Sequence, residues 1–300
     1  MMLGLSISAS RIFAKEAGVP LWKYIEKIGG FPARYQPPVL FFNLINGGMH
    51  AKNAVDIQEY LLVVKSMTVG ESIFLATRKF SQLCDVAKEK FGRGIIEIGD
   101  EGGLVLPTKS NIEPIELLKN AISSQENIYI GLDIAASTLY KENRYSWEGN
   151  LIETSDLINI YFRWCRDYNL FSIEDPFSED DPDGFFKLRK LVGHDTLIVG
   201  DDLTATNPER IEEASRNNLI SALIIKPNQI GTVSETLEAI HRACNLGLKT
   251  IVSHRSGETM DVFIADLAWG SNAFGLKAGA PTQPERLAKY NRLIEIEKSI

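Results

Sequence analysis

Cysteine is scarce in this sequence, in which only Cys84, Cys165 and Cys244 occur among 300 residues. Their spacing matches neither a metal-ligand pattern nor a disulfide framework. Few and unpaired cysteines are typical of thiols that stay reduced inside the cell, so we expect reduced core thiols in a cytoplasmic protein. The pattern argues against a secreted domain held together by disulfides.

Long hydrophobic runs are also missing. No stretch approaches the roughly 18 consecutive apolar residues that a membrane-spanning helix needs. The N-terminal segment is partly apolar, but it lacks a basic beginning and is interrupted by serines and then by charges. Its helical spacing continues through Ile12, Phe13 and Ala17, which favours a packed helix over a signal peptide. We therefore expect neither a membrane span nor a cleaved leader.

Positive charge is in the minority. The formal net charge is -7 and the pI is about 5.3, which argues against binding to nucleic acid or to an acidic membrane. Hydrophobic residues make up 44% of the chain and the mean hydropathy is -0.07, as in an ordinary soluble globular protein. A length of 300 residues fits one α/β barrel, which commonly takes about 250. We expect one compact domain over residues 1–300.

The stretch 196–230 shows how the chain is organised. Two apolar runs flank a helical segment, and the first run leads to Asp201 whereas the second leads to Lys226. A continuous apolar run is typical of a buried parallel strand, and the connecting helix places the next strand beside it. The carboxylate and the lysine should therefore lie together at one rim of a sheet, where α/β proteins build their active sites.

The same alternation continues through most of the chain. Two N-terminal helices precede a β-β-α-α opening, for which we expect strands at 37–42 and 57–64 and helices at 69–91 and 112–123. The turn glycines between the two strands suggest a hairpin-like start. Six further strands should end at Asp133, Glu174, Asp201, Lys226, His254 and Lys277. Helices should alternate with them at 155–168, 184–192, 208–217, 233–246, 258–269 and 284–298. This order predicts an α/β fold, a parallel sheet of eight strands that closes as a (β/α) barrel.

Three acids at successive strand ends, Asp133, Glu174 and Asp201, indicate a metal site. Any one of them could be a surface acid in a salt bridge. Together they would place three anions in one buried spot, which is costly unless a cation compensates them. Ligation by oxygen alone favours magnesium over zinc.

Lys226 follows one strand further round and is a natural general base. The alternative, a solvated surface amine, is the commoner fate of a lysine. A neighbouring metal ion would disfavour the charged form and lower the pKa of Lys226 towards the working range. Arg255, Ser256 and Lys277 form a positive wall on the next strands, which suits a substrate bearing phosphate or carboxylate.

The order of the motifs resembles that of the enolase (phosphopyruvate hydratase) family, from near the first residue to the last. The motifs that carry this resemblance are GGMHAKN, DIQEY, GDEGG, LDIAAS, SIEDPF, GDDLTATNP, LIIKPNQIGT, SHRSGET, LKAGAP and ERLAKYNRLIEIE. The resemblance implies a C-terminal catalytic barrel of the enolase type. It also implies a carbon–oxygen lyase of glycolysis and gluconeogenesis that dehydrates 2-phosphoglycerate to phosphoenolpyruvate with Mg²⁺.

The resemblance also assigns roles to residues. Asp133, Glu174 and Asp201 match the magnesium ligands, Lys226 matches the base that removes the C2 proton, and Glu101 matches the group that helps the C3 hydroxyl leave. Because this acid must be protonated, we expect burial near Glu59 to raise its pKa. The positions that match substrate-binding residues are His50, Gln58, Glu59, His254, Arg255, Ser256 and Lys277. Within this set, the arginine and the serine match phosphate contacts, and the lysine faces the substrate carboxylate.

The sequence departs from the family pattern in three places. Met260 stands where an acid is common, and we expect it to be tolerated on the following helix. The loops around LVLPTKSN and Pro182 also differ. The α+β domain that precedes the barrel in the family is absent from the sequence.

Three hypotheses follow. The chain is the barrel part of a split or truncated enolase whose N-terminal domain is a separate partner. Alternatively, it is another enolase-superfamily enzyme acting on a carboxylate, or an inactive enolase-like binding protein. The filled catalytic positions favour the first hypothesis, and the family pattern also implies a homo-oligomer.

Overall fold

The computed structural model describes residues 2–51, 55–65, 68–92, 97–122 and 127–300. Eight strands form a barrel that closes where the last of them pairs with the first. They are β1 (Val39–Asn46), β2 (Glu59–Val64), β5 (Ile128–Asp133), β9 (Ser172–Glu174), β10 (Leu197–Gly200), β11 (Ala222–Ile225), β12 (Lys249–Ser253) and β13 (Gly275–Lys277). The predicted eight-stranded α/β barrel is confirmed.

One barrel strand runs against the rest. β2 pairs antiparallel with both β1 and β5, whereas the other neighbouring barrel strands pair parallel. The hairpin-like start expected for the first two strands is therefore confirmed, whereas the description of the whole sheet as parallel is wrong at β2. The described part of the segment between β1 and β2 contains one turn of 3-10 helix, η1 (Gly48–His50), and not the α-helix that usually connects parallel neighbours.

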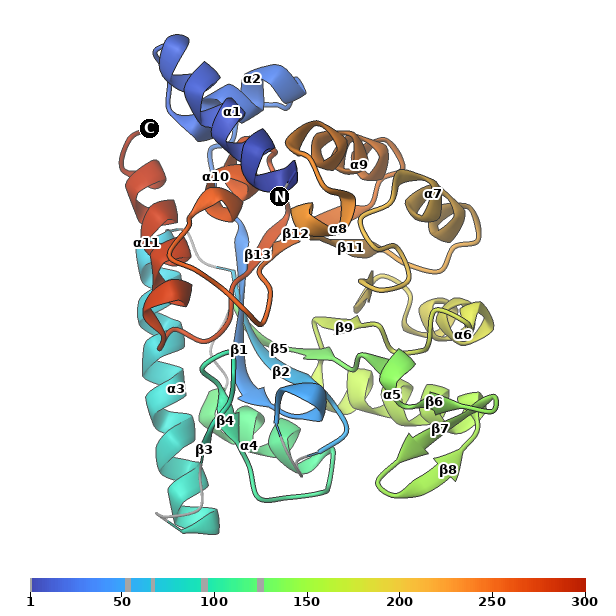
Figure 1. Cartoon of the computed structure of the whole chain (residues 1–300). Helices are drawn as coiled ribbons and strands as arrows, with labels where there is room; N and C mark the ends of the chain where they lie inside the picture. Colours follow the sequence, from blue (N-terminus) through green and yellow to red (C-terminus); the bar gives the residue numbers. More distant parts are fainter. Residues whose placement is uncertain (1, 52–54, 66–67, 93–96, 123–126) are drawn as a thin grey trace.

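The helices surround the barrel (Figure 1). They are α1 (Met2–Glu16), α2 (Leu21–Gly29), α3 (Val69–Phe91), α4 (Glu113–Ile122), α5 (Thr154–Tyr168), α6 (Pro182–Val192), α7 (Pro208–Arg216), α8 (Pro227–Ile230), α9 (Val233–Asn245), α10 (Phe263–Gly270) and α11 (Pro284–Glu297). The first two pack on the outside of the barrel against α9 and α10. No helix in the described ranges is both long enough and apolar enough to cross a membrane.

Helix α10 begins later than the predicted start at residue 258. The backbone before it is held by one tertiary and one local contact. The Thr259 carbonyl accepts a hydrogen bond from Lys289, and the Asp261 carboxylate accepts one from the Phe263 amide at 2.8 Å. Met260 therefore lies in this loop with 61% of its surface exposed, and not on a helix. The predicted helix 112–123 matches α4, although Ser123 lies outside the described residues.

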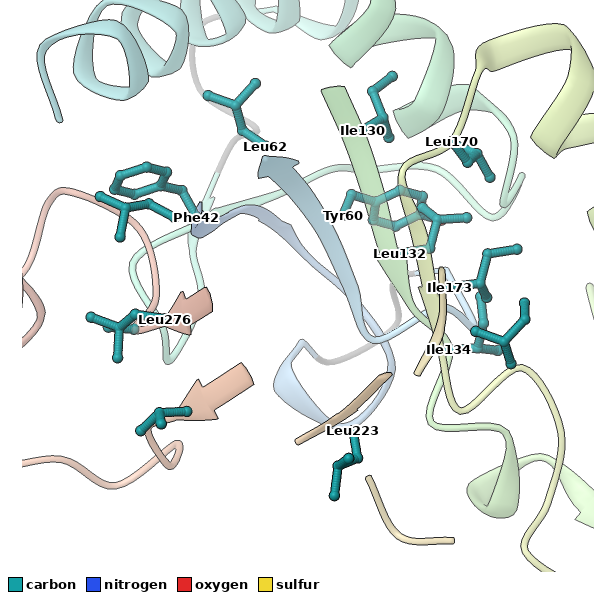
Figure 2. Close-up of a cluster of buried hydrophobic side chains, with 14 of the residues drawn as sticks. Phe42, Tyr60, Leu62, Ile130, Leu132, Ile134, Leu170, Ile173, Leu223 and Leu276 are labelled. Carbon is teal, nitrogen blue, oxygen red and sulfur yellow. The ribbon is translucent and has the colours of Figure 1, made fainter. Parts of the chain in front are cut away.

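Two hydrophobic clusters follow from the alternation of side chains along each strand. The smaller one consists of strand residues that fill the barrel interior: Val39, Phe41, Leu61, Val63, Leu197, Val199, Ala222, Ile224 and Ile251. The larger one joins the opposite strand faces to the helices, and Phe42, Leu62, Leu132 and Leu223 belong to it (Figure 2). The same alternation decides which polar residues point inward at the ends of the strands.

Two features were not expected from the sequence. A hairpin pair, β3 (Glu97–Ile98) and β4 (Leu104–Val105), joins the end of β1 and carries the loop between them. A separate sheet is formed by β6 (Tyr140–Lys141), β7 (Arg144–Trp147) and β8 (Asn150–Ile152). The prediction of core thiols is wrong for Cys244, which is exposed, while Cys84 and Cys165 are half-buried and all three thiols are free.

Candidate active site

The inward face of the barrel strands carries the charged residues of the site. In β10, Leu197 and Val199 fill the barrel interior, so Asp201 two residues later follows the same inward direction. The same spacing applies to Lys226 after Ile224 in β11. The pairing register places Glu59, Asp133 and Glu174 at one level of three adjacent strands.

A cavity of about 180 Å³ opens at this end of the barrel. Its lining is Gln58, Glu59, Glu101, Asp133, Ala135, Thr138, Asp175, Asp201, Asp202, Lys226, Ser253, His254, Arg255, Ser256 and Lys277. The cavity therefore unites both predicted catalytic residues and six of the seven predicted substrate-binding residues. The seventh, His50, ends η1, and its side chain lies outside the described part, as do residues 52 and 53 of the GGMHAKN motif.

Lys277 lies at the centre of three carboxylates. Its Nζ is 2.9 Å from Glu59, 2.8 Å from Asp133 and 2.9 Å from Glu174, and all four side chains are buried. Burial lowers the pKa of Lys277, but the three acids outweigh burial and raise that pKa well above its ordinary value. Burial raises the pKa of Glu59 and Glu174, whereas Asp133 has a lowered pKa because Lys277 offsets its burial. The lysine is therefore charged and supplies part of the compensation that the acids need.

Lys226 forms a second buried ion pair, with Asp201. Burial lowers the pKa of Lys226, yet Asp201 and Glu174 outweigh burial and leave the pKa raised. The lowering that a neighbouring metal ion would cause stays a prediction, and the raised pKa describes the effect of the chain's own residues. The reason is that the neighbouring carboxylates stabilise the ammonium form.

Glu101 is held from two sides. Asn43 Nδ2 donates a hydrogen bond of 3.0 Å to Glu101 Oε2, and His254 Nε2 lies 3.2 Å from the same oxygen. All three side chains are almost fully buried. Burial lowers the pKa of His254, so the imidazole is neutral at neutral pH. His254 therefore places no positive charge beside Glu101.

Some site residues escaped the sequence reasoning. Asn43 is an inward residue of β1, and a polar residue within the apolar run VLFFNLIN was the signal. Asp175 accepts hydrogen bonds from the amides of Asp201 at 2.9 Å and Asp202 at 2.7 Å. It therefore holds the turn that aims Asp201 at the cavity, a contact between separate strands that spacing alone does not reveal.

The donor set fits a hard divalent cation. Oxygens of Asp175, Asp201 and Asp202 lie within 4.8 Å of one another, as do ligand atoms of Glu59, Glu101 and His254. Oδ1 of Asp201 is buried and has no hydrogen-bond partner within the described ranges. Among the described residues in and beside the cavity, seven carboxyl groups meet three cationic side chains, those of Lys226, Arg255 and Lys277, which leaves more acidic than basic groups. Such an excess and an orphaned carboxylate oxygen favour a cation.

The fold and the site define a (β/α) barrel protein with acidic side chains at its mouth that could hold a metal ion. The model of the enolase C-terminal TIM barrel domain matches residues 34–300, and the chain belongs to the enolase family. It is 42% identical over 299 residues to the enolase of Aeropyrum pernix, covering 98% of this chain and 68% of that protein.

Two other relatives give the same result. The chain is 40% identical to the enolase of Bdellovibrio bacteriovorus, covering all of this chain and 71% of that protein. It is 39% identical to the enolase of Methanocaldococcus jannaschii, covering all of this chain and 70% of that protein. The predicted family is confirmed, whereas the roles assigned to individual residues stay predictions.

Proposed function

We propose that this chain carries the catalytic site for the magnesium-dependent dehydration of 2-phosphoglycerate to phosphoenolpyruvate. The observation that carries the proposal is one cavity lined by Lys226, whose side chain is 16% exposed, and by the buried acid Glu101. They come from parts of the barrel that are separated by β12 and β13. A base and an acid placed apart around a small cavity suit an elimination, in which one group takes a proton and the other helps a hydroxyl leave.

The chain's own residues divide this reaction between them. Lys226 takes the proton from C2, and the electron pair of that C–H bond forms the C2=C3 double bond. The C3–O bond breaks, and Glu101 gives its proton to the departing hydroxyl, which leaves as water. Arg255 and Ser256, which line the outer part of the cavity, would bind the phosphate, and Lys277 would stabilise charge on the substrate carboxylate.

Asp133, Glu174 and Asp201 are the residues that we propose as magnesium ligands. A bound magnesium ion would supply positive charge next to the substrate carboxylate. Lys226 must be unprotonated to act as a base, and its ion pair with Asp201 opposes this. We infer that occupation of the Asp201 carboxylate by a ligand weakens this pair and lowers the pKa of Lys226.

The test of the function is turnover of 2-phosphoglycerate by the purified chain, with and without magnesium. The chain matches 68% to 71% of its relatives' length, so the assay is repeated with the unmatched part of the Aeropyrum pernix enolase added. A rate that rises on addition would support the predicted partner domain. A magnesium-dependent rate without it would show that the chain suffices. Magnesium binding with no turnover in either assay would favour another carboxylate substrate or a binding role. The expected homo-oligomer and cytoplasmic location stay predictions.

Asp201→Asn is expected to weaken magnesium binding by at least about tenfold. About tenfold is the smallest loss typical of mutating a residue that only orients a metal ligand, and loss of a ligand itself should cost no less. The orphaned Oδ1 of Asp201 is the reason, because an amide offers less negative charge to the ion. Calorimetric titration with magnesium measures the affinity. Asp183→Asn on the exposed face of α6 is the control and should leave the affinity unchanged. Equal affinities for the two variants would show that Asp201 is not a ligand.

A further inference from the structure

Arg286 is a buried guanidinium that contacts two separate loops of the candidate site. It lies in the first turn of α11 with 1% of its surface exposed. It donates to the carbonyls of Arg255 at 2.7 Å and Ser256 at 2.6 Å, and reaches the carbonyl of Asp100 at 3.4 Å. These acceptors are neutral, so this charge serves to fix backbone positions and not to pair with an acid. One side chain thereby holds the Glu101 loop and the Arg255 loop at a fixed separation.

The residues around Arg286 leave room for its side chain and hold the adjacent Glu101 loop in place. Gly279 has φ of +82°, and a Cβ at this position would come within 3.0 Å of both Arg286 Cδ and the Glu101 carbonyl oxygen. The Glu101 carbonyl also accepts a hydrogen bond of 2.9 Å from the Ala280 amide, and Tyr290 donates one of 2.7 Å to the Gly279 carbonyl. The Glu101 loop therefore has little freedom to move away from Arg286.

The guanidinium group also determines which ring nitrogen of His254 carries the hydrogen. Arg286 Nη1 is 2.5 Å from His254 Nδ1. Arginine has only donor hydrogens and stays protonated, so Nδ1 must be the acceptor. A neutral imidazole then carries its hydrogen on Nε2, which lies 3.2 Å from Glu101 Oε2.

The same reasoning extends to Glu101. Its Oε2 accepts a hydrogen bond from Asn43, and His254 Nε2 lies 3.2 Å from the same oxygen without forming a hydrogen bond in the described ranges. In a protonated carboxyl group the oxygen without the hydrogen is the better acceptor, so the oxygen that accepts from Asn43 and lies near a second N–H is not the one that bears the proton. If Glu101 gives a proton to a leaving hydroxyl, that proton must therefore lie on Oε1.

We propose that Arg286 is a positioning residue that fixes His254 in the Nε2–H tautomer and thereby assigns the acidic proton of Glu101 to Oε1. The catalytic role of the Glu101 proton rests on the proposed function, whereas the tautomer of His254 does not depend on it. Sequence reasoning did not single out Arg286, because its role depends on contacts with loops about 30 and 186 residues away.

The tautomer is measured by ¹⁵N NMR of the imidazole groups in the full chain, which has four histidines. We expect His254 to show an unprotonated Nδ1 and a protonated Nε2. In Arg286→Met this pattern should shift towards the other tautomer or a mixture. Arg292→Met is the control, since Arg292 lies on the same helix but pairs with Asp266 at 2.8 Å, and it should leave His254 unchanged. A protonated Nδ1 in the unmodified chain, or an unchanged pattern in folded Arg286→Met, would overturn the proposal.

Kinetic measurements distinguish a positioning role of Arg286 from a general disturbance of the site. Arg286→Met is expected to slow water loss by about 10²-fold, the effect of a small misplacement of a reacting group. Exchange of the C2 hydrogen with solvent depends on Lys226 and should fall much less. Equal losses of both activities would count against a role through Glu101. If the methionine variant does not fold, Arg286→Lys takes its place, because it keeps the charge but loses the planar fork. Absence of turnover and exchange in the unmodified chain, both alone and with the unmatched part of the Aeropyrum pernix enolase added, would refute the proposed function. The NMR measurement would still establish the tautomer.

Discussion

Replacing Lys226 with alanine is expected to lower kcat for the dehydration of 2-phosphoglycerate by about 10²–10⁴-fold. The physical reason is that the C2 hydrogen is very weakly acidic, so that its removal needs a base, and Lys226, the base that we propose, lines the cavity beside Asp201. Steady-state kinetics at saturating magnesium measures the loss. Exchange of the C2 hydrogen with deuterated solvent should disappear together with turnover, because both need the same proton transfer.

The matched control is Lys187→Ala. Lys187 lies on the exposed side of α6, where it pairs with Asp183 four residues earlier, so its removal should leave kcat unchanged. Persistent C2 exchange in Lys226→Ala would identify a different base. A turnover deficit shared by both lysine variants would indicate a fault in folding and not in chemistry.

Replacing Lys277 with methionine is expected to lower the free energy of unfolding by about 3–5 kcal/mol at pH 7 without divalent cations. The change leaves Glu59, Asp133 and Glu174 buried without the ammonium group that contacts all three. Urea unfolding in the presence of a chelator measures the effect. Lys90→Met is the control, because its pair with Glu113 is half-exposed and contributes at most about 1 kcal/mol.

The deficit of Lys277→Met should depend on pH. Glu59 and Glu174 already have pKa values above the ordinary 4.5, chiefly because of burial, and loss of Lys277 raises them further. A raised pKa in the folded state stabilises the protein below the unfolded pKa, and this contribution is lost as pH rises through the folded pKa. The deficit should therefore be smallest near pH 4.5 and grow towards pH 7. A deficit that is constant over this range would show that lost packing and not unpaired charge causes it.

The local sequence predicted most elements of the fold correctly. Helix α3 was expected at 69–91 and is observed at Val69–Phe91, because its helical spacing and its Thr68 cap are local signals. Helix α7 begins after Asn207, whose side chain caps it, followed by a proline that favours the first helical turn. The hairpin-like start was predicted as well, because the glycines between the first two strands are a local turn signal. The late start of α10 was not predicted, since it depends on a contact with the distant Lys289.

For the candidate site, too, part was predictable from the sequence and part depended on tertiary contacts. The sequence by itself determined which charged residues end the strands, because an apolar run followed by a charge is visible along the chain, as at Asp133 and Lys226. Strand alternation then determined that they face inward. Only the tertiary structure decided how their charges are shared: Lys277 lies among three acids, and Lys226 pairs with Asp201 and has a raised pKa. Burial and the approach of strands distant in sequence control these energies, and neither can be read from residue spacing.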